Sequence, residues 1–345
     1  MPLPPETLPA ASSHGAPAPG GGEALIRLAQ VTRRFGDFTA VDHVSLDIAR
    51  GEVFGLIGHN GAGKSTLFKM MLGLLAPSEG QIHIAGQSVA GASSREVRRR
   101  LGYLPENVAL WDNLSGLETL RFFARLKQID PRECQPLLER VGLGHAGTRA
   151  VRAYSKGMRQ RLGFAQALLG TPQVLFLDEP TTGLDPSAIH FFWDTLAELR
   201  AQGLTIVLTS HILAELQNRV DRVAVMTNGR VQALGSIEEL RAGFDLPVTV
   251  RARLALPATA GTEALHALLP PALSDIVFHT EDDGTVLCRV ARGRKLDLLR
   301  ALLGESGPVR DIQVQEPSLE DMFFSRTSPA RSRPGHTDSS RETQP

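Results

Sequence analysis

Cysteine, aromatic residues and long apolar runs are all scarce in this sequence of 345 residues. Its 2 cysteines, Cys134 and Cys288, cannot build a disulfide framework, which suits a reducing compartment. No apolar run approaches the roughly 18 residues that a membrane-crossing helix needs. Lys plus Arg and Asp plus Glu number 37 each, so the net charge gives no sign of a nucleic-acid partner. These absences predict a cytoplasmic chain whose membrane role, if any, is reached through a partner.

The length allows two compact domains with tails at both ends. Residues 1–23 are rich in Pro, Ala and Gly and lack a basic segment followed by an apolar core, so we expect a disordered tail and no signal peptide. The polar residues 327–345 are expected to be a second disordered tail. Between them the sequence predicts one domain over residues 24–242 and a smaller one over residues 246–326.

One glycine-rich stretch organises the larger domain. It fits the pattern G-x-x-x-x-G-K-[ST] of loops that wrap nucleotide phosphates, and it reads Gly58-His59-Asn60-Gly61-Ala62-Gly63-Lys64-Ser65, continued by Thr66. The preceding residues 53–57 are apolar, as in a buried strand, and residues 67–75 have a helical pattern. A strand, this loop and a helix in that order make a chance glycine-rich turn a poor explanation. The sequence therefore predicts an ATP site.

The residue types in the loop explain its chemistry. Glycines let successive backbone N–H groups turn towards an anion at φ values that a side chain disfavours. Lys64 can place its ammonium on the β- and γ-phosphates, and the Ser65 hydroxyl can bind Mg²⁺. The positive N-terminal end of the following helix adds to the attraction.

The rest of the larger domain predicts an α/β fold with an antiparallel β part and a helical insert. Residues 25–48 alternate as strands do, and the apolar run 174–177 is typical of a parallel strand covered on both faces. A helical insert is expected over about residues 102–170, including a capping box at Ser115 and Glu118. Further expected elements are a helix over 186–202, a strand over 204–208 and a hairpin at Asn228-Gly229. The basic stretch 94–100 is either a solvated helix face or an anion contact.

The smaller domain has the order β-α-β-β-α-β, which predicts a ferredoxin-like fold. Its expected elements lie at 248–254, 262–269, 276–279, 286–290, 294–303 and 309–314, with a last short helix from residue 317. His266, His279 and Cys288 are its candidate metal ligands, but they are scattered, which favours structural roles over a closed metal site.

Polar residues follow two apolar strands of the larger domain. Asp178 and Glu179 come directly after residues 174–177, and His211 follows the strand expected at 204–208. Open α/β sheets bind ligands at this edge. Asp178 can hold Mg²⁺ through water, and Glu179 can orient an attacking water or take its proton. An exposed acidic turn is the alternative, and it fits poorly after four apolar residues.

With these residues in place, the chain resembles the ATP-binding subunits of ABC transporters over roughly residues 25–240. Residues 154–160 stand where that family has its signature, usually Leu-Ser-Gly-Gly-Gln. The resemblance implies that Ser155, Gly157 and Gln160 form a half-site, in which Ser155 caps a helix and offers donors to a γ-phosphate. It also implies that this phosphate is held by a second copy of the chain in a head-to-tail dimer.

The same resemblance assigns four further residues. Asp185 matches the loop that crosses the dimer interface, Phe35 the aromatic that stacks on adenine, and His211 the γ-phosphate switch histidine. Glu106 replaces the family's glutamine, which touches Mg²⁺ and the transmembrane partner. Glu106 can therefore be a Mg²⁺ ligand or merely face solvent.

One subgroup is similar in several segments. Residues 102–108, 113–116, 120–127, 154–162 and 317–321 resemble the ATPase of the copper-processing transporter that matures nitrous oxide reductase, the NosF type. That resemblance implies a membrane-spanning permease, a periplasmic partner and a place on the inner face of the cytoplasmic membrane.

Three alternatives remain open at this point. The first is an ATPase of another ABC exporter, with drug, glycan or haem-related cargo. The second is a soluble ABC ATPase acting on DNA or ribosomes, which usually has two cassettes or long coiled-coil arms. The third is a regulatory or metal-sensing protein built on the smaller domain, which its lack of clustered ligands disfavours.

Overall fold

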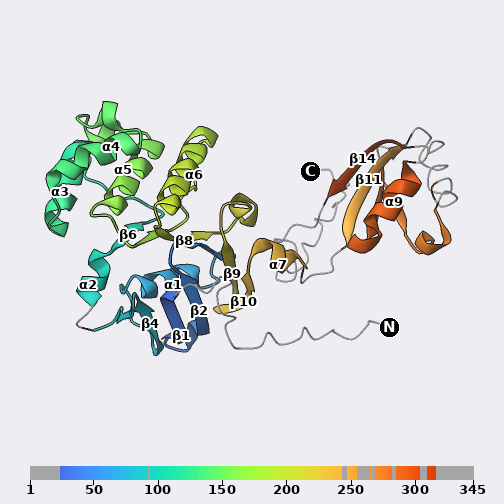
Figure 1. Cartoon of the computed structure of the whole chain (residues 1–345), viewed down its shortest axis with the longest axis horizontal. Helices are drawn as coiled ribbons and strands as arrows, with labels where there is room; N and C mark the ends of the chain where they lie inside the picture. The colour runs from blue at the N-terminus through green and yellow to red at the C-terminus, as the bar shows by residue number, and fades with distance from the viewer. Residues whose placement is uncertain are drawn as a thin grey trace, which may run out of the picture. The chain divides into compact units, whose positions relative to one another are not determined.

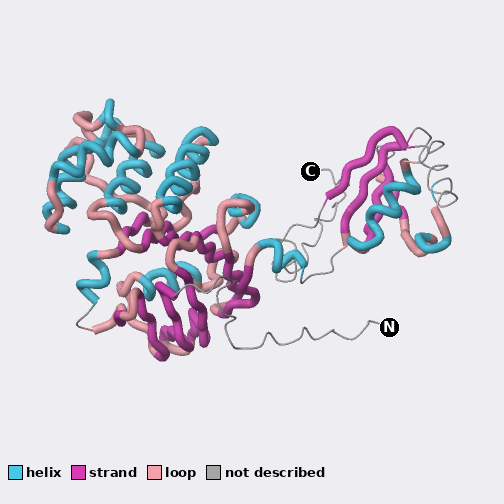
Figure 2. Tube along the Cα trace, in the orientation of Figure 1, coloured by secondary structure: helices cyan, strands magenta, loops and turns pink. Residues whose placement is uncertain are grey.

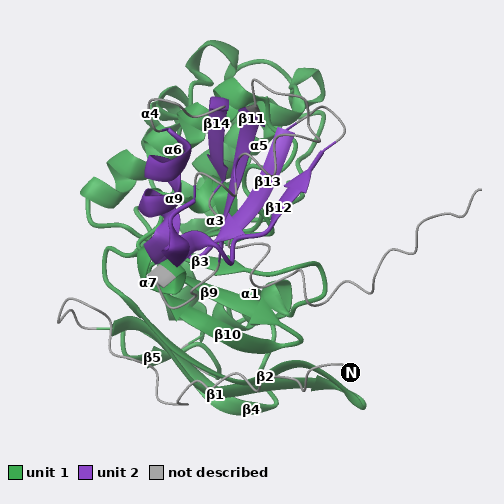
Figure 3. Ribbon diagram, turned by 90° about the vertical axis from the view of Figure 1, so that its right-hand side faces the viewer, with its two compact units in different colours: residues 1–243 green, residues 244–345 purple. Residues whose placement is uncertain are grey.

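The chain divides into two compact units, residues 1–243 and 244–345 (Figure 3, green and purple). The computed structural model describes residues 24–91, 94–242, 247–254, 265, 269–281, 285–303 and 309–315. Both expected tails, residues 1–23 and 327–345, lie outside the described residues, as does the short helix expected from residue 317.

The first unit contains a six-stranded sheet and a four-stranded antiparallel sheet (Figure 1). The six-stranded sheet has the order β10(Arg230–Gly235), β9(Arg222–Thr227), β3(Val53–Ile57), β8(Thr205–Ser210), β7(Val174–Leu177), β6(Leu101–Leu104). Strands β9, β3, β8, β7 and β6 run parallel, and β10 is antiparallel to β9. The four-stranded sheet has the order β2(Phe38–Ala49), β1(Ala24–Phe35), β4(Glu79–Ile84), β5(Gln87–Ser88).

Helix α1(Lys64–Met71) packs between the two sheets. Its Phe68 meets the Phe176 ring of β7 edge to face at a centroid distance of 5.2 Å. Side chains of β1 and β2 join the same buried cluster from the antiparallel side. Burial of this apolar surface is the main stabilising contribution to such a unit, so the helix that follows the phosphate loop is fixed on both sides.

The remaining helices in the described part of this unit are α2(Ser94–Arg99), α3(Gly116–Lys127), α4(Cys134–Arg140), α5(Lys156–Leu168), α6(Pro186–Ala201) and α7(Ile237–Ala242). Short 3₁₀ turns lie at Pro131–Glu133, Gly144–Ala146, Val151–Ala153 and Leu213–Leu216. Helices α3, α4 and α5 gather in one lobe (Figure 2, cyan). The capping box is confirmed, because Ser115 Oγ accepts from Glu118 N and Ser115 N donates to the Glu118 carboxylate.

The expected start of the helical insert, near residue 102, is wrong. Residues Leu101–Leu104 form β6 at the edge of the six-stranded sheet, parallel to β7. The strand is short and contains Gly102, so its apolar pattern is weak. A Cβ at Gly102 would stand 2.3 Å from the Ala167 carbonyl oxygen, which shows why this position is a glycine. The helical lobe begins only after β6.

The hairpin at Asn228-Gly229 is confirmed. Both residues have positive φ, 50° and 77°, as a two-residue hairpin turn of this kind requires. The helix expected over 186–202 ends at Ala201 because Gly203 has a φ of 86°. The helix expected over 67–75 instead runs from Lys64 to Met71, since the loop's own lysine already has helical geometry and Gly73 turns with a φ of 64°. In the basic stretch, Arg100 pairs with Glu96 on the exposed side of α2.

The described residues of the second unit form an antiparallel sheet, in the order β12(Phe278–Thr280), β13(Thr285–Val290), β11(Val248–Leu254), β14(Val309–Gln315). Helix α9(Lys295–Leu302) buries Leu298 and Leu302 in a cluster with Val250 and Cys288. Short 3₁₀ turns lie at Pro271–Leu273 and Arg292–Arg294. Most of the helix expected over 262–269 lies outside the described residues. The ferredoxin-like assignment therefore stays a prediction.

No helix among the described residues is both long enough and apolar enough to span a membrane.

Candidate nucleotide site

The phosphate loop connects β3 to α1 with the backbone geometry its glycines were expected to supply. Gly61 and Gly63 have φ values of 86° and 100°. A Cβ at Gly63 would stand 2.4 Å from the Ala40 carbonyl oxygen, and one at Gly58 would stand 2.6 Å from the Met226 carbonyl oxygen. Side chains at these positions would displace the loop from β2 and β9. The loop is therefore held against the sheets on two sides.

Lys64 is buried at the first position of α1, with 6% of its side chain exposed. Its Nζ donates to the carbonyl oxygens of Gly58, at 2.6 Å, and His59, at 3.3 Å. Burial lowers the pKa of Lys64, and the carboxylates of Glu179, Asp178 and Glu106 oppose that shift. The ammonium is thus held in the loop by carbonyls, and Glu179 Oε1 lies 3.8 Å from Lys64 Nζ.

The carboxyl ends of neighbouring strands bring the expected catalytic residues together. Glu179 follows β7, and its Oε2 lies 2.8 Å from His211 Nδ1, which follows β8. Thr209, fully buried in β8, serves both carboxylate positions: its Oγ1 donates to Asp178 Oδ1 at 2.7 Å and accepts from Glu179 N at 2.9 Å. Sequence reasoning missed Thr209, whose only signal is a hydroxyl at the end of a buried strand.

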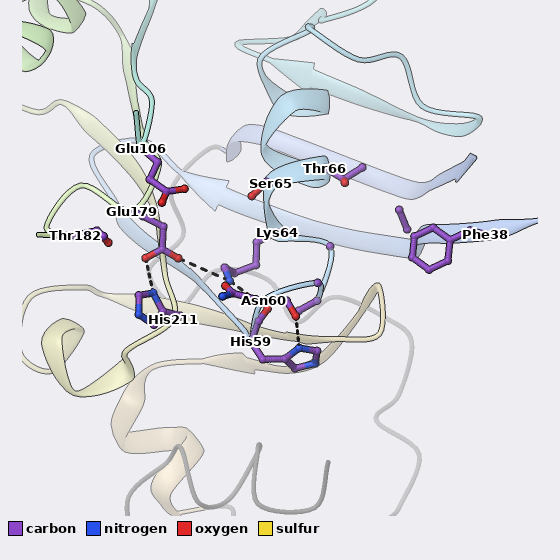
Figure 4. Close-up of a pocket in the computed structure, with 14 residues that line it drawn as sticks. Phe38, His59, Asn60, Lys64, Ser65, Thr66, Glu106, Glu179, Thr182 and His211 are labelled. Carbon is purple, nitrogen blue, oxygen red and sulfur yellow. Dashed lines mark hydrogen bonds and ion pairs between the residues drawn. The ribbon is translucent and has the colours of Figure 1, made fainter. Parts of the chain in front are cut away.

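A pocket of about 510 Å³ opens over the loop (Figure 4). Glu179 lies between Lys64 and His211 in this view, and Glu106 lies on the same side of the pocket. The lining residues are Phe38, Ala40, His59, Asn60, Gly61, Ala62, Gly63, Lys64, Ser65, Thr66, Glu106, Glu179, Thr182 and His211. Phosphate-loop residues, a carboxylate and an imidazole thus share one cavity, the arrangement expected of a site that binds and cleaves a nucleoside triphosphate.

The oxygen donors of the site suit Mg²⁺. Ser65 and Glu106 line the pocket, and Asp178 stands beside Glu179 at the end of β7. Hydroxyl and carboxylate oxygens, completed by phosphate oxygens and water, are the ligands this ion prefers. The three residues expected to bind the ion therefore fit it chemically.

The aromatic residue of the pocket differs from the expected one. Phe38 lines the pocket, whereas Phe35, its partner across the β1–β2 turn, is not among the lining residues. The Arg33 guanidinium lies over the Phe35 ring, 4.6 Å from the centroid. Sequence reasoning missed Phe38 because two phenylalanines flank one tight turn and their local pattern does not indicate which of them lines the pocket.

The signature residues lie apart from this pocket, since none of Ser155, Gly157, Gln160 and Asp185 is among its lining residues. As expected, Ser155 caps a helix: its Oγ accepts from Met158 N at 3.2 Å at the start of α5. Asp185 caps α6 in the same way, and the hydrogen bond from Ser187 lowers its pKa. Gln160 donates to the Pro180 carbonyl oxygen at 3.4 Å. The helix that carries the signature therefore contacts the segment that leads away from Glu179.

The two described candidate metal ligands of the second unit, His279 and Cys288, lie in different surroundings. His266 lies outside the described residues, His279 is exposed on β12, and Cys288 is buried in the apolar core, where burial raises its pKa to about 11. No group of three or more His, Cys, Asp or Glu side chains suited to a metal ion occurs in the described part of the chain.

Comparisons with known proteins agree with this geometry. The ABC transporter family matches residues 41–182. The chain is 37% identical over 313 residues to the daunorubicin resistance ATP-binding protein DrrA3 of Streptomyces coeruleorubidus, covering 87% of this chain and 94% of that protein. It is 35% identical over 297 residues to the human phospholipid-transporting ATPase ABCA3, covering 83% of this chain but 17% of that protein.

A solved structure of the ATP-binding subunit of an ABC transporter is 34% identical to the chain, with a TM-score of 0.59, and the match covers 64% of this chain and 93% of that one. The likeness in sequence, fold and site geometry leads to one assignment. The chain belongs to the ATP-binding subunits of ABC transporters, the ATPases that couple ATP hydrolysis to transport.

Proposed function

We propose that the chain drives a separate permease by closing on a second copy of itself around two ATP molecules. The observation that carries this proposal is the distribution of the site: the pocket holds the phosphate loop, Glu179 and His211, whereas Ser155 and Gly157 lie outside it. One subunit then supplies two incomplete half-sites. Two copies arranged head to tail complete both, which gives a closed, symmetric assembly.

The roles of the residues follow from their surroundings. Lys64 binds the β- and γ-phosphates in place of the carbonyls that now hold it. Glu179 takes a proton from the attacking water, and His211, at 2.8 Å, fixes that carboxylate and contacts the γ-phosphate. Mg²⁺, held by Ser65, Asp178 and Glu106 when bound, would neutralise phosphate charge. Ser155 of the partner copy donates to the γ-phosphate, so closure of the dimer depends on the presence of that phosphate.

An exposed aromatic cluster gives the permease a place to bind. We define the aromatic cluster as Trp111, Phe122 and Phe123, of which Trp111 is 46% and Phe122 39% exposed. Trp111 follows Glu106 in the segment between β6 and α3, where the resemblance places contact with the transmembrane partner. Exposed aromatic groups of this kind are typical of protein interfaces. The chain would then lie on the inner face of the cytoplasmic membrane, with any periplasmic partner reached through the permease.

The cargo that we favour is an amphipathic organic molecule, such as a drug or a lipid. The match to the daunorubicin resistance protein covers 87% of this chain, more than residues 1–243 can supply, so it includes part of the second unit. The names of the relatives refer to a drug and to phospholipids. Copper processing for nitrous oxide reductase is the second candidate, and it rests on the NosF-type motif segments alone.

The shared-site mechanism is tested with the Glu179→Gln variant. It keeps the shape of the site without the base, so turnover should fall about 100-fold or more while ATP still binds. Sedimentation with Mg-ATP should show a dimer, and adding Ser155→Arg should abolish it. A Glu179→Gln protein that stays monomeric, alone and with its permease, would rule the mechanism out.

Binding through the loop has its own matched pair. Lys64→Ala should weaken ATP binding about 10- to 100-fold because it removes charged hydrogen bonds worth about 1.5–3 kcal/mol. Lys69→Ala, which removes an exposed lysine from the same helix, should not. Unchanged binding by Lys64→Ala in a nucleotide titration would remove the loop from the mechanism.

The cargo is decided with the membrane protein that co-purifies with the chain. In vesicles, ATPase activity should rise with an added anthracycline or lipid and should not respond to Cu⁺. Stimulation by Cu⁺ alone, or nitrous oxide reductase genes beside this one, would instead select the copper candidate.

A further inference from the structure

The segment that carries Trp111 is bonded to the segment that leads into the signature. Val151 N donates to the Leu114 carbonyl oxygen at 2.8 Å, and Arg152 N donates to the Asp112 carbonyl oxygen at 3.1 Å. A backbone bridge also pairs Ser115 with Ala150. These bonds join the two segments up to Arg152, three residues before Ser155. They do not reach α5 itself.

One side-chain contact continues the connection onto the helix. Arg159 Nη2 of α5 lies 2.8 Å from Asp112 Oδ1, and Arg159 N donates to the Ser155 carbonyl oxygen in the first turn. Asp112 adjoins Trp111, whose ring lies 4.8 Å from the Phe122 ring and 5.8 Å from the Phe123 ring. A single ion pair thus separates the first turn of the signature helix from the aromatic cluster.

The position of Arg159 is electrostatically unfavourable without that carboxylate. The first turn of α5 contains no acidic residue, and both Lys156 and Arg159 lie in it. A helix N-terminus carries partial positive charge and disfavours cations. The Asp112 carboxylate offsets this at Arg159, so the ion pair favours one placement of the helix start relative to the Trp111 segment.

We propose that Arg159 is a positioning residue that couples Ser155 to the aromatic cluster through Asp112. Binding of the permease at the aromatic cluster and binding of ATP by Ser155 then favour each other, because each stabilises the same placement of α5. The inference rests on the proposed function, in which Ser155 binds the ATP of a second copy. Asp112 is 64% exposed, so the pair is worth only about a three- to fivefold change in the equilibrium.

The chain itself contains the probe for a test. It has 2 tryptophans, and Trp193 is 8% exposed, so Trp193→Phe leaves Trp111 as the only reporter while an aromatic ring stays beneath Arg219. In Trp193→Phe with Glu179→Gln, we expect acrylamide quenching of Trp111 to change when Mg-ATP forms the dimer. Adding Arg159→Ala should weaken the dimer about three- to fivefold by sedimentation and abolish the change at Trp111. Binding of ATP to the monomer should stay the same.

The charge swap separates positioning from general damage. Asp112→Arg with Arg159→Asp should restore both the dimer and the Trp111 response, whereas Arg121→Ala, an exposed arginine of α3 outside the pair, should change neither. Thermal unfolding checks that the fold is intact. A parent protein that does not dimerise overturns the proposed function, whereas a dimer and Trp111 response unaffected by Arg159→Ala overturn this inference alone.

Discussion

Glu179 occupies an unusual backbone position in the candidate site. Its φ of 46° lies in the left-handed region, which is uncommon outside glycine, asparagine and aspartate. The conformation turns the carboxylate away from the end of β7 towards Lys64 and His211, and the Thr209 hydroxyl holds its N–H. Backbone strain of this kind is found where function requires a particular side-chain direction. The placement of one carboxylate thus depends on a threonine of the neighbouring strand.

The two phenylalanines of the β1–β2 turn give a residue-scale prediction. Phe38 is 64% exposed in the pocket lining, and Phe35 is 47% exposed with Arg33 over its ring. If Phe38 stacks on the base, Phe38→Ala should weaken ATP binding more than Phe35→Ala, by about 1–3 kcal/mol. Titration of both variants with ATP and with inorganic triphosphate, which has no base, measures this. If Phe38→Ala weakened the binding of inorganic triphosphate as much as the binding of ATP, a stacking role for Phe38 would be contradicted.

Glu106 gives a second residue-scale prediction. Its carboxylate lines the pocket and contributes to the charge that acts on Lys64. Glu106→Gln should leave ATP binding intact but raise the Mg²⁺ concentration needed for half-maximal turnover, because a charged oxygen ligand is lost. Mg²⁺ titration of ATPase activity, alone and with the permease, is the measurement. Glu96→Gln, on the exposed side of α2, is the matched control, and identical Mg²⁺ curves for both variants would make Glu106 a bystander.

At the scale of elements, a buried ion pair ties the two sheets of the first unit together. Arg222 of β9 pairs with Glu52 at 3.3 Å, and Arg222 Nη1 donates to the Asp47 carbonyl oxygen of β2. Glu52 also accepts from Ala49 N at 2.7 Å. The pair lies where β2 turns into β3, the strand that leads to the phosphate loop. It therefore fixes the antiparallel sheet against the strand that positions the loop.

The pair predicts a pH dependence of stability. Burial raises the pKa of Glu52 above its ordinary value of 4.5, although Ala49 N–H and Arg222 oppose the shift. An acid whose folded pKa is raised binds its proton more tightly in the folded state. The contribution of Glu52 protonation to the free energy of unfolding is therefore present below pH 4.5. It is lost as the pH rises through the folded pKa of Glu52.

The measurement compares wild type with Glu52→Gln, which cannot titrate. The difference in Tm between them should shrink as the pH rises from 4.5 through the raised folded pKa of Glu52. Glu79→Gln, on the exposed pair with Arg34, should show no such trend. A Tm difference for Glu52→Gln that grows with pH over this range would show that the ion pair outweighs burial.

For the whole molecule, the division into two units predicts independent folding. Residues 1–243 contain both sheets of the first unit, its core and every lining residue of the pocket. A fragment ending at residue 243 should therefore stay soluble and bind ATP with the affinity of the full chain. Circular dichroism and nucleotide titration measure this, and aggregation of the fragment would show that the boundary is misplaced.

A shorter fragment is the matched contrast. Ending the chain at residue 227 removes β10, which pairs with β9, and Gly229, whose N–H donates to the Ala62 carbonyl oxygen of the phosphate loop. This fragment should lose both stability and ATP affinity. Equal behaviour of the two fragments would mean that β10 does not support the loop.

Many local structures of this protein are determined by residues that are close together in the sequence. The phosphate loop, the caps at Ser115 and Ser155 and the hairpin at Asn228 depend on residues a few positions apart, so their patterns could be read directly. Asp178, Glu179 and His211 could be expected at one sheet edge because parallel strands place their carboxyl ends together.

Only the tertiary structure decided the contacts between distant segments. Strand β6 exists because its short, glycine-containing stretch pairs with β7, which local pattern cannot reveal. The choice of Phe38 over Phe35 in the pocket depends on how the hairpin packs against the loop. Thr209 with Asp178, and Arg159 with Asp112, are joined across 31 and 47 residues. Such contacts follow from packing and strand order, and the free energy that selects them belongs to the whole fold.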